Sequence, residues 1–141
     1  MSDDQPFAAF AGDFRGDLIR PPDAGYDEAR RLYNGMIDKQ PRLIARCADI
    51  ADVIRAVNFG RDSGMTIAIR GGGHNGPGLG SVDDGLVIDL SSMKGVRIDP
   101  VARTARVGAG CTQGDLDHAA HAFGLATPAG IISSTASLAS R

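Results

Sequence analysis

The chain has 141 residues, of which 43% are hydrophobic and 23% are charged, and its formal net charge is -2. This length allows one domain at most, with a modest core, and the composition is that of a globular protein. The near-neutral charge without a basic cluster argues against a nucleic-acid partner, and no apolar run approaches the ~20 residues that span a membrane. The first residues lack the basic and apolar regions of a signal peptide, so we expect a cytoplasmic protein.

The first half of the chain predicts a small α/β unit. Residues 1–24 mix small, acidic and proline residues and are expected to form a loosely ordered arm, and a short helix is expected over residues 27–32. A strand at residues 42–45 precedes a helix that begins after Asp49, and another strand follows at residues 66–69. Strand, helix and strand in this order indicate one crossover connection.

The helix after Asp49 has the clearest pattern in the chain. Its apolar residues recur at intervals of three and four, as on one face of a helix: Ile50, Val53, Ile54 and Val57. Cys47 stands between the strand and this helix and is interpreted as a buried structural thiol. Because Cys47 and Cys111 are far apart and have no C-x-x-C spacing, neither a disulfide framework nor a zinc site is predicted.

A glycine-rich loop separates the strand at residues 66–69 from a strand predicted at residues 86–90. Seven of the fifteen residues from Gly71 to Gly85 are glycine. Glycine lacks a Cβ, so it can adopt a positive φ and let consecutive backbone N–H groups point into one concavity, which suits phosphate oxygens. The loop is therefore predicted to hold the diphosphate of a nucleotide cofactor.

This loop also spells the dinucleotide fingerprint G-x-G-x-x-G with Gly71, Gly73 and Gly76, and the acidic Asp89 follows further on. The fingerprint has meaning only if its last glycine opens a helix whose N-terminus faces the diphosphate. Residues 77–81 are Pro-Gly-Leu-Gly-Ser, which cannot carry a helix. An NAD-binding Rossmann domain is therefore disfavoured, and a loop that relies on its own amides is preferred.

After these strands, alternating apolar residues predict an antiparallel hairpin over residues 96–98 and 105–107, with one buried face. The hairpin ends in a second run of small residues at 108–111. Thr112 and Asp115 then form a capping-box-like start for a helix.

Histidines and hydroxyls on and after this helix are weaker candidates. His118 and His121 lie at i, i+3 on its polar face and could bind a metal with a nearby aspartate, but such histidines are usually only solvated, and no metal is predicted. The hydroxyls of Ser133, Ser134 and Thr135 could reach a phosphate.

His74 and Cys111 are the two reactive residues that border the small-residue runs. His74 ends the triple glycine, where it is open to whatever the loop holds. Cys111 stands just before a helix start, where free amides and the helix dipole favour the thiolate. Taken singly, each is read more simply, as a loop histidine that makes a backbone hydrogen bond and as a small buried cysteine. The sequence alone does not show whether the two side chains meet.

Three ordered blocks, at residues 70–75, 85–91 and 108–116, carry a resemblance to a known family. From about Arg30 to Thr135 the chain resembles the FAD-binding domain of the berberine-bridge-enzyme-like oxidoreductases, in the vanillyl-alcohol-oxidase or PCMH-type flavoprotein group. The resemblance implies an α+β fold in which two small α/β subdomains cradle FAD. This chain would hold the first subdomain, a strand-helix-strand unit, and the start of the second.

The resemblance also implies a chemistry and a set of cofactor-binding residues. A small organic substrate would give a hydride to flavin N5, and the reduced flavin would pass its electrons to oxygen or another acceptor. His74 would be tethered to the flavin 8α-methyl carbon and Cys111 to flavin C6; the presence of both argues against the related flavoproteins without covalent attachment. The implied cofactor-binding residues are Arg70, Gly71, Gly72, Gly73, His74, Asn75, Gly76, Leu90, Ser91, Gly110, Cys111, Gly114, Asp115, Gly130, Ser133, Ser134 and Thr135.

The resemblance stops at Ala136, where the family pattern has glycine. We therefore expect an N-terminal arm at residues 1–29, a partial FAD-binding domain at residues 30–135, and a divergent tail at residues 136–141 that marks a truncated or frameshifted portion of a longer enzyme. No catalytic base can be named within the chain. The alternative is a non-catalytic remnant that binds a nucleotide weakly or not at all.

Overall fold

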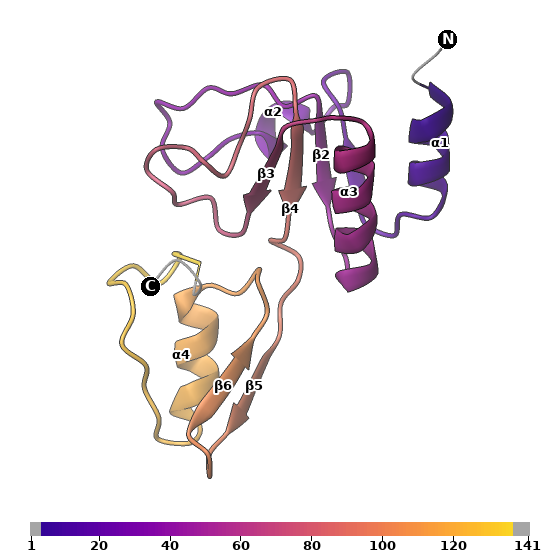
Figure 1. Ribbon diagram of the computed structural model, residues 1–141. Coiled ribbons are helices and arrows are strands. Elements are labelled where there is room, and N and C mark those ends of the chain that lie inside the picture. The colour runs from indigo at the N-terminus through magenta and orange to yellow at the C-terminus, as the bar shows by residue number, and fades with distance from the viewer. Residues whose placement is uncertain (1–3, 137–141) are drawn as a thin grey trace.

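The computed structural model describes residues 4–136, which form two bodies (Figure 1). The larger body holds a four-stranded sheet and three helices, and the smaller one holds a two-stranded hairpin and one helix. The segment after β4 connects them. The elements are α1 (Asp4–Gly12), β1 (Asp17–Ile19), α2 (Tyr26–Ala29), β2 (Leu43–Arg46), α3 (Ile50–Asp62), β3 (Ile67–Arg70), β4 (Leu86–Asp89), β5 (Val96–Asp99), β6 (Thr104–Val107) and α4 (Gln113–His121).

The sheet of the larger body has the strand order β1-β2-β4-β3. The strands β2, β4 and β3 run parallel, and β1 pairs with β2 in the antiparallel direction. The predicted crossover from β2 through α3 to β3 is confirmed, but β4 lies between those two strands. The register places Arg46 and Arg70 on either side of Asp89 at the carboxyl ends of the strands.

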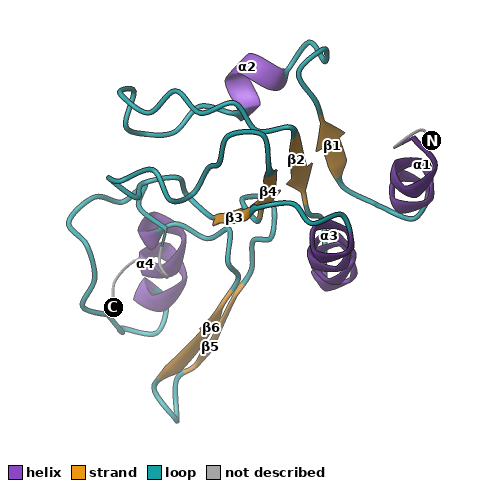
Figure 2. Ribbon diagram, turned by 45° about the horizontal axis from the view of Figure 1, so that its top comes forward, coloured by secondary structure: helices purple, strands orange, loops and turns teal. Residues whose placement is uncertain are grey.

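Apolar side chains cover both faces of this sheet. Figure 2 shows α3 on one side of the sheet and α2 on the other. Leu86 and Ile88 of β4 belong to the cluster under α1 and α3, and Val87 belongs to the cluster under α2, because alternate residues of a strand face opposite sides. Cys47 is fully buried in the first cluster, as predicted, and burial raises the pKa of its thiol to about 12.

Residues 4–19 form α1 and β1 and pack against the sheet, so the prediction of a loosely ordered arm is wrong. The ring of Phe10 stacks on Phe59 of α3, with the ring centroids 4.4 Å apart and the planes at 8°. The carboxylate of Asp52 in α3 accepts hydrogen bonds from the backbone N–H groups of Arg15 and Gly16 at 3.0 and 2.9 Å. Aromatic packing and a buried carboxylate thus fasten α1 and β1 to the sheet.

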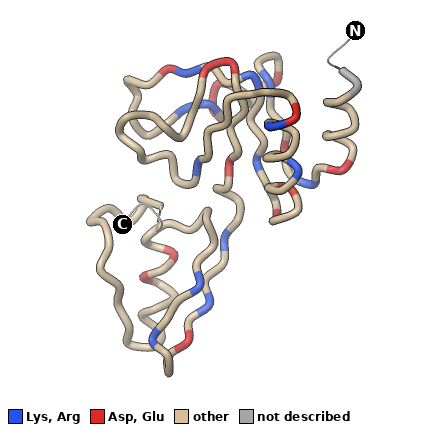
Figure 3. The backbone as a smooth tube through the Cα atoms, in the orientation of Figure 1, with Lys and Arg blue, Asp and Glu red and all other residues tan. Residues whose placement is uncertain are grey.

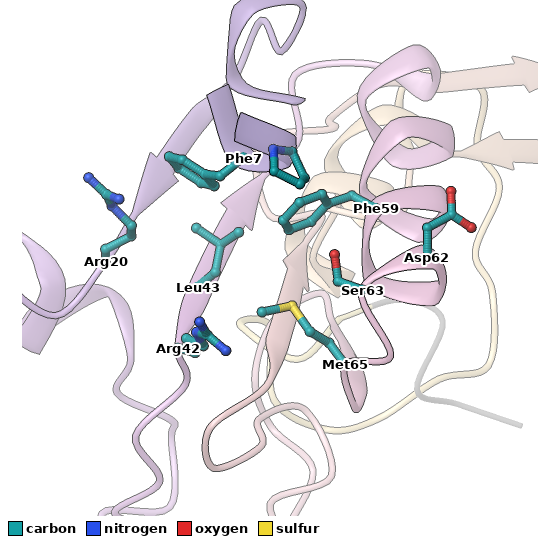
Figure 4. Close-up of a pocket in the computed structure, with 9 residues that line it drawn as sticks. Phe7, Arg20, Arg42, Leu43, Phe59, Asp62, Ser63 and Met65 are labelled. Carbon is teal, nitrogen blue, oxygen red and sulfur yellow. The ribbon is translucent and has the colours of Figure 1, made fainter. Parts of the chain in front are cut away.

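The junction of α1 with the sheet also forms a pocket of about 540 Å³ (Figure 4). Phe7, Leu43 and Phe59 form its apolar walls, and the guanidinium of Arg20 lies 4.7 Å from the centre of the Phe7 ring. This pocket shares no lining residue with the glycine loop.

The helix α3 begins at its Asp49 N-cap as predicted, but of its predicted apolar stripe only Val53 packs against the core cluster. The side chains of Ile50 and Ile54 are 70% and 57% exposed, whereas Asp52, Ala56 and Gly60 face the sheet. A Cβ at Gly60 would lie 2.7 Å from Ile67 Cδ1, so a small residue is required for the helix to approach the strands.

The smaller body contains the predicted hairpin and the predicted helix α4, which lies beside it (Figure 1). The expected buried face of the hairpin is wrong: Val96, Ile98 and Val107 are only half-buried, and Ala105 is exposed. The reason is that one short helix cannot cover the whole ribbon. Charged residues of both signs are spread over both bodies (Figure 3). Among residues 4–136, no helix is long and apolar enough to cross a membrane.

Candidate functional site

The glycine loop lines a cavity of about 640 Å³ between the two bodies. This volume is in the range of about 300–1,000 Å³ that is usual for small-ligand sites. The larger body supplies the strand end and the glycine loop, and the smaller body supplies Ala109 and the segment at its C-terminal end. Nine of the predicted site residues line the cavity: Arg70, Gly71, Gly72, Gly73, His74, Asn75, Gly76, Leu90 and Thr135.

The loop contains glycines with the positive φ values that the sequence predicts. Gly73 and Gly78 have φ values of +72° and +76°, which glycine adopts without strain. No helix follows Gly76, as predicted, which removes the main requirement of a Rossmann site. Among the hydrogen bonds within residues 4–136, none is donated by the backbone N–H groups of residues 71–76. These amides are therefore available to an anionic ligand.

Glycine is also required because the two bodies approach each other closely here. A Cβ at Gly71 would lie 2.9 Å from the carbonyl oxygen of Ala109, and a Cβ at Gly72 would lie 3.1 Å from the backbone nitrogen of Ala136. A Cβ at Gly110 would lie 2.4 Å from the carbonyl oxygen of Leu90. These distances show that glycine is needed at these three positions for the chain to pack against its own backbone, whether or not a ligand is bound.

Arg70 brings a buried cation to the wall of the cavity. Its Nη2 donates hydrogen bonds to Asp89 Oδ2 at 2.7 Å and to the carbonyl oxygen of Ala29 at 2.8 Å. Its Nη1 is buried and has no hydrogen-bond partner among the described residues. A buried N–H without a partner costs free energy, so this guanidinium is a candidate donor beside the cavity that Arg70 lines.

The charge of Arg70 is balanced by Asp89, which is also buried. Burial by itself raises the pKa of the Asp89 carboxyl, but the Arg70 charge and the hydrogen bonds from Ser91 and Arg70 outweigh it and hold this pKa below its usual value. Arg46 Nε lies 3.6 Å from the same carboxylate. Asp89 is therefore the anion that fixes Arg70 in place, and sequence reasoning did not predict this role.

His74 lies at the cavity and is held from the outside by a segment that sequence reasoning missed. The imidazole stacks on the ring of Tyr33, with the centroids 4.2 Å apart. Asn34 Nδ2 donates to the carbonyl oxygen of Gly76 at 3.1 Å, and Lys39 Nζ donates to that of Gly78 at 2.9 Å. An aromatic, an amide and a lysine within seven residues were the signal that could have indicated this contact.

Cys111 is not among the residues that line the cavity. Its side chain is 1% exposed, and its Sγ accepts a hydrogen bond from the backbone N–H of Gly95 at 3.2 Å. Ala109, two residues earlier, does line the cavity. The structure therefore brings His74 to the cavity and keeps the Cys111 thiol in the packing below the helix start, so the meeting of the two side chains stays a prediction.

The remaining predicted site residues either contact other parts of the chain or are exposed to solvent away from the cavity. The Asp115 carboxylate completes the predicted capping box with Thr112 and lies 3.2 Å from Lys94 Nζ; the Thr112 backbone N–H and Lys94 lower the pKa of this carboxyl. The backbone N–H of Gly114 donates to the carbonyl oxygen of Ser133 at 2.9 Å. Ser91 donates its backbone N–H to Asp89, and Gly110 packs against Leu90, while Gly130 and Ser134 are exposed and do not line the cavity.

The metal alternative finds no support in the part of the chain that the structure describes. His118 and His121 are both exposed on α4, and residues 4–136 contain no group of three or more side chains that could hold a metal ion. The predicted tail at residues 136–141 lies outside the described residues except for Ala136, which packs on the glycine loop.

Comparison with known proteins decides the family. Residues 41–139 match the family described as an FAD binding domain. The chain belongs to this family. It is 39% identical over 117 residues to (R)-6-hydroxynicotine oxidase of Paenarthrobacter nicotinovorans, which covers 83% of this chain and 26% of that protein. It is 35% identical over 128 residues to an FAD-linked oxidoreductase of Dictyostelium discoideum, covering 89% of this chain and 28% of that protein.

Solved structures support the same assignment for this FAD-binding domain. The crystal structure of 6-hydroxy-D-nicotine oxidase from Arthrobacter nicotinovorans superposes with a TM-score of 0.84 at 37% identity, over 88% of this chain and 27% of that one. A berberine-bridge-enzyme-like protein of Physcomitrella patens gives a TM-score of 0.85 at 30% identity, over 93% and 29%. The predicted family and its PCMH-type α+β fold are confirmed. The chain spans about a quarter of the length of these relatives.

The described geometry fits the cofactor of this family. FAD carries a diphosphate, and the lining of the cavity includes loop glycines whose amides donate no hydrogen bond and Arg70, whose Nη1 has no partner among the described residues. A Cβ at Gly71 or Gly72 would clash with the backbone of Ala109 or Ala136, which packs against the glycine loop beside the cavity.

Proposed function

We propose that this chain is the FAD-binding portion of an oxidoreductase that oxidises a small organic substrate by hydride transfer to a bound flavin. The observation that carries the proposal is the cavity beside the glycine loop, lined by glycines whose amides donate no hydrogen bond and by Arg70, whose buried Nη1 has no partner among the described residues. The similar proteins support it, because they are FAD-linked oxidoreductases. In such enzymes the cofactor supplies the redox chemistry, and the protein supplies binding and orientation.

Within this proposal the residues have separate roles. The amides of the glycine loop hold the diphosphate, and Arg70, fixed by its bonds to Asp89 and Ala29, lines the same cavity. Thr135 lines the same cavity, and its hydroxyl is assigned to a ligand oxygen in the proposal. Ser133 and Ser134 precede Thr135 in the chain, and the proposal includes their hydroxyls as further hydrogen-bond donors to the phosphates.

The proposal includes two covalent links, from His74 to the flavin 8α carbon and from Cys111 to flavin C6. Each bond replaces one C–H hydrogen of the flavin and one N–H or S–H hydrogen of the protein. The net loss of two hydrogens requires an oxidant, and dioxygen can accept them as hydrogen peroxide. His74 already borders the cavity, whereas Cys111 must turn its sulfur away from Gly95 to reach a ring there.

The test is the retention of flavin colour after acid precipitation of the purified chain, supplied with FAD. Colour in the pellet supports covalent flavin, and the double variant His74→Ala, Cys111→Ala should release it into the supernatant. The matched control is His118→Ala, because this histidine is exposed on α4 and away from the cavity.

The other outcomes separate the alternatives. Flavin that washes out of the wild-type chain would indicate a non-covalent flavoprotein. No bound flavin at all, from a chain with a cooperative unfolding transition, would favour the non-catalytic remnant.

A further inference from the structure

Tyr33 makes a specific ring contact with His74 across forty residues of sequence. The two ring centroids lie 4.2 Å apart and the planes are tilted by 21°, which is a stacked arrangement. His74 is half-buried and borders the cavity, whereas Tyr33 is 68% exposed and does not line it. The tyrosine ring therefore covers one face of the imidazole while the cavity remains open to the histidine from another direction.

Two hydrogen bonds tie the segment around Tyr33 to the glycine loop. The N–H of Tyr33 donates to the carbonyl oxygen of Gly73 at 3.3 Å, and the next side chain, Asn34, bonds to the carbonyl of Gly76. His74 thus lies between two anchored positions. A glycine-rich backbone has little stiffness of its own, so these contacts, with the ring stack, restrict the directions in which the imidazole can point.

We infer that Tyr33 is a positioning residue, which holds the imidazole of His74 by ring stacking so that its edge faces the cavity. The inference rests on the proposed function, in which His74 is the point of flavin attachment. Ring stacking of this kind favours the stacked conformation over the unstacked one by about 2- to 12-fold. An imidazole held in this way meets the flavin in one orientation. Loss of this orientation slows the reaction between the two groups.

The first test needs no flavin and uses diethylpyrocarbonate, which modifies accessible imidazoles. The chain has three histidines, and the exposed His118 and His121 serve as references within the same molecule. We expect Tyr33→Ala to raise the modification rate of His74 relative to His118 by about 2- to 12-fold, and Tyr33→Phe to leave it within about 2-fold of wild type. Met36→Ala is the matched control, because Met36 lies in the same segment and is 90% exposed.

An unchanged ratio in Tyr33→Ala overturns the inference. Should that variant fail to fold, the wild-type chain gives the answer, because stacked rings must show nuclear Overhauser contacts between the Tyr33 and His74 ring protons. Absence of these contacts in a folded wild-type chain equally overturns it.

The second test separates this inference from the proposed function. In a chain that takes up covalent flavin, Tyr33→Ala should slow attachment by about 10-fold or more and leave the amount of non-covalently bound flavin unchanged. A purely structural role would lower both. If the wild-type chain attaches no flavin, the proposed link is wrong while the stacking result stands; if Tyr33→Ala attaches flavin at the wild-type rate, the positioning role is wrong while the link stands.

Discussion

Replacing Asp89 by asparagine tests whether the buried ion pair holds the site together. Asp89 is 2% exposed and accepts hydrogen bonds from Arg70 at 2.7 Å and from the Ser91 backbone at 2.9 Å. Asparagine keeps the volume but removes the charge, so the guanidinium of Arg70, 7% exposed, loses its counter-ion. Breaking a buried pair in this way costs about 3–5 kcal/mol. Because Arg70 keeps its bond to Ala29, we expect a loss of about 3 kcal/mol in the free energy of unfolding.

Urea unfolding followed by far-UV circular dichroism measures this loss. A domain is typically stable by about 5–15 kcal/mol, so the expected change is a large shift of the midpoint. The control is Asp62→Asn, the same substitution in an aspartate that is also paired with an arginine, Arg61, but on the surface, and its midpoint should stay at the wild-type value. If Asp89→Asn moves the midpoint no further than Asp62→Asn does, the pair is not a determinant of stability and the reasoning is refuted.

The pH dependence gives a second reading of the same pair. The pKa of Asp89 is lowered in the folded chain, while an unfolded aspartate titrates near a pKa of about 3.9. A lowered folded pKa means that the stabilisation is fully present above about pH 4 and is lost as the pH falls through the folded value. In Asp89→Asn, unfolding should therefore depend less on pH below about pH 4 than in wild type.

Further substitutions address packing and buried hydrogen bonds. Gly110→Ala places a Cβ 2.4 Å from the Leu90 carbonyl, so it should abolish cooperative thermal unfolding, whereas Gly130→Ala, which has open space around it, should leave the transition unchanged. Phe10→Ala removes the stack on α3 and should lower the free energy of unfolding in urea by about 3–5 kcal/mol. Asp52→Ala leaves three backbone N–H groups without their acceptor and should cost at least about 3 kcal/mol in the same assay.

The parts of the fold that the sequence predicts are those set by local signals. The Asp49 N-cap and the capping box of Thr112 and Asp115 act within one helical turn, and both were predicted correctly. The N-terminal helix was missed although Phe7 and Phe10 recur at helical spacing on its core side, and Phe14 beyond its end packs on the same cluster. The small and acidic residues between them suggested disorder, and the core surface that receives these rings lies about fifty residues further along the chain.

Long-range contacts explain why the site was predicted only in part. The composition of the glycine loop is enough to predict it, but its partners Asn34 and Lys39 contact it from 42 and 39 residues away in the sequence. Arg70 was predicted as a cofactor residue from the resemblance, while its bond to Asp89, 19 residues away, follows from strand register. The outward face of α3 likewise depends on which side of the helix carries Gly60, and periodicity of apolar residues does not contain that information.

The absence of a side chain at the loop glycines has two consequences, the close approach of other backbone segments and the exposure of the loop amides. Gly71 and Gly72 let the backbones of Ala109 and Ala136 approach, so the cavity between the two bodies exists only when the bodies are docked. The same absence of side chains leaves the loop amides uncovered for an anion. A ligand that binds in the cavity contacts both bodies and therefore stabilises their docking by mass action. Cofactor binding and the packing of the smaller body against the glycine loop are thus one coupled equilibrium, since each supplies a surface that the other needs.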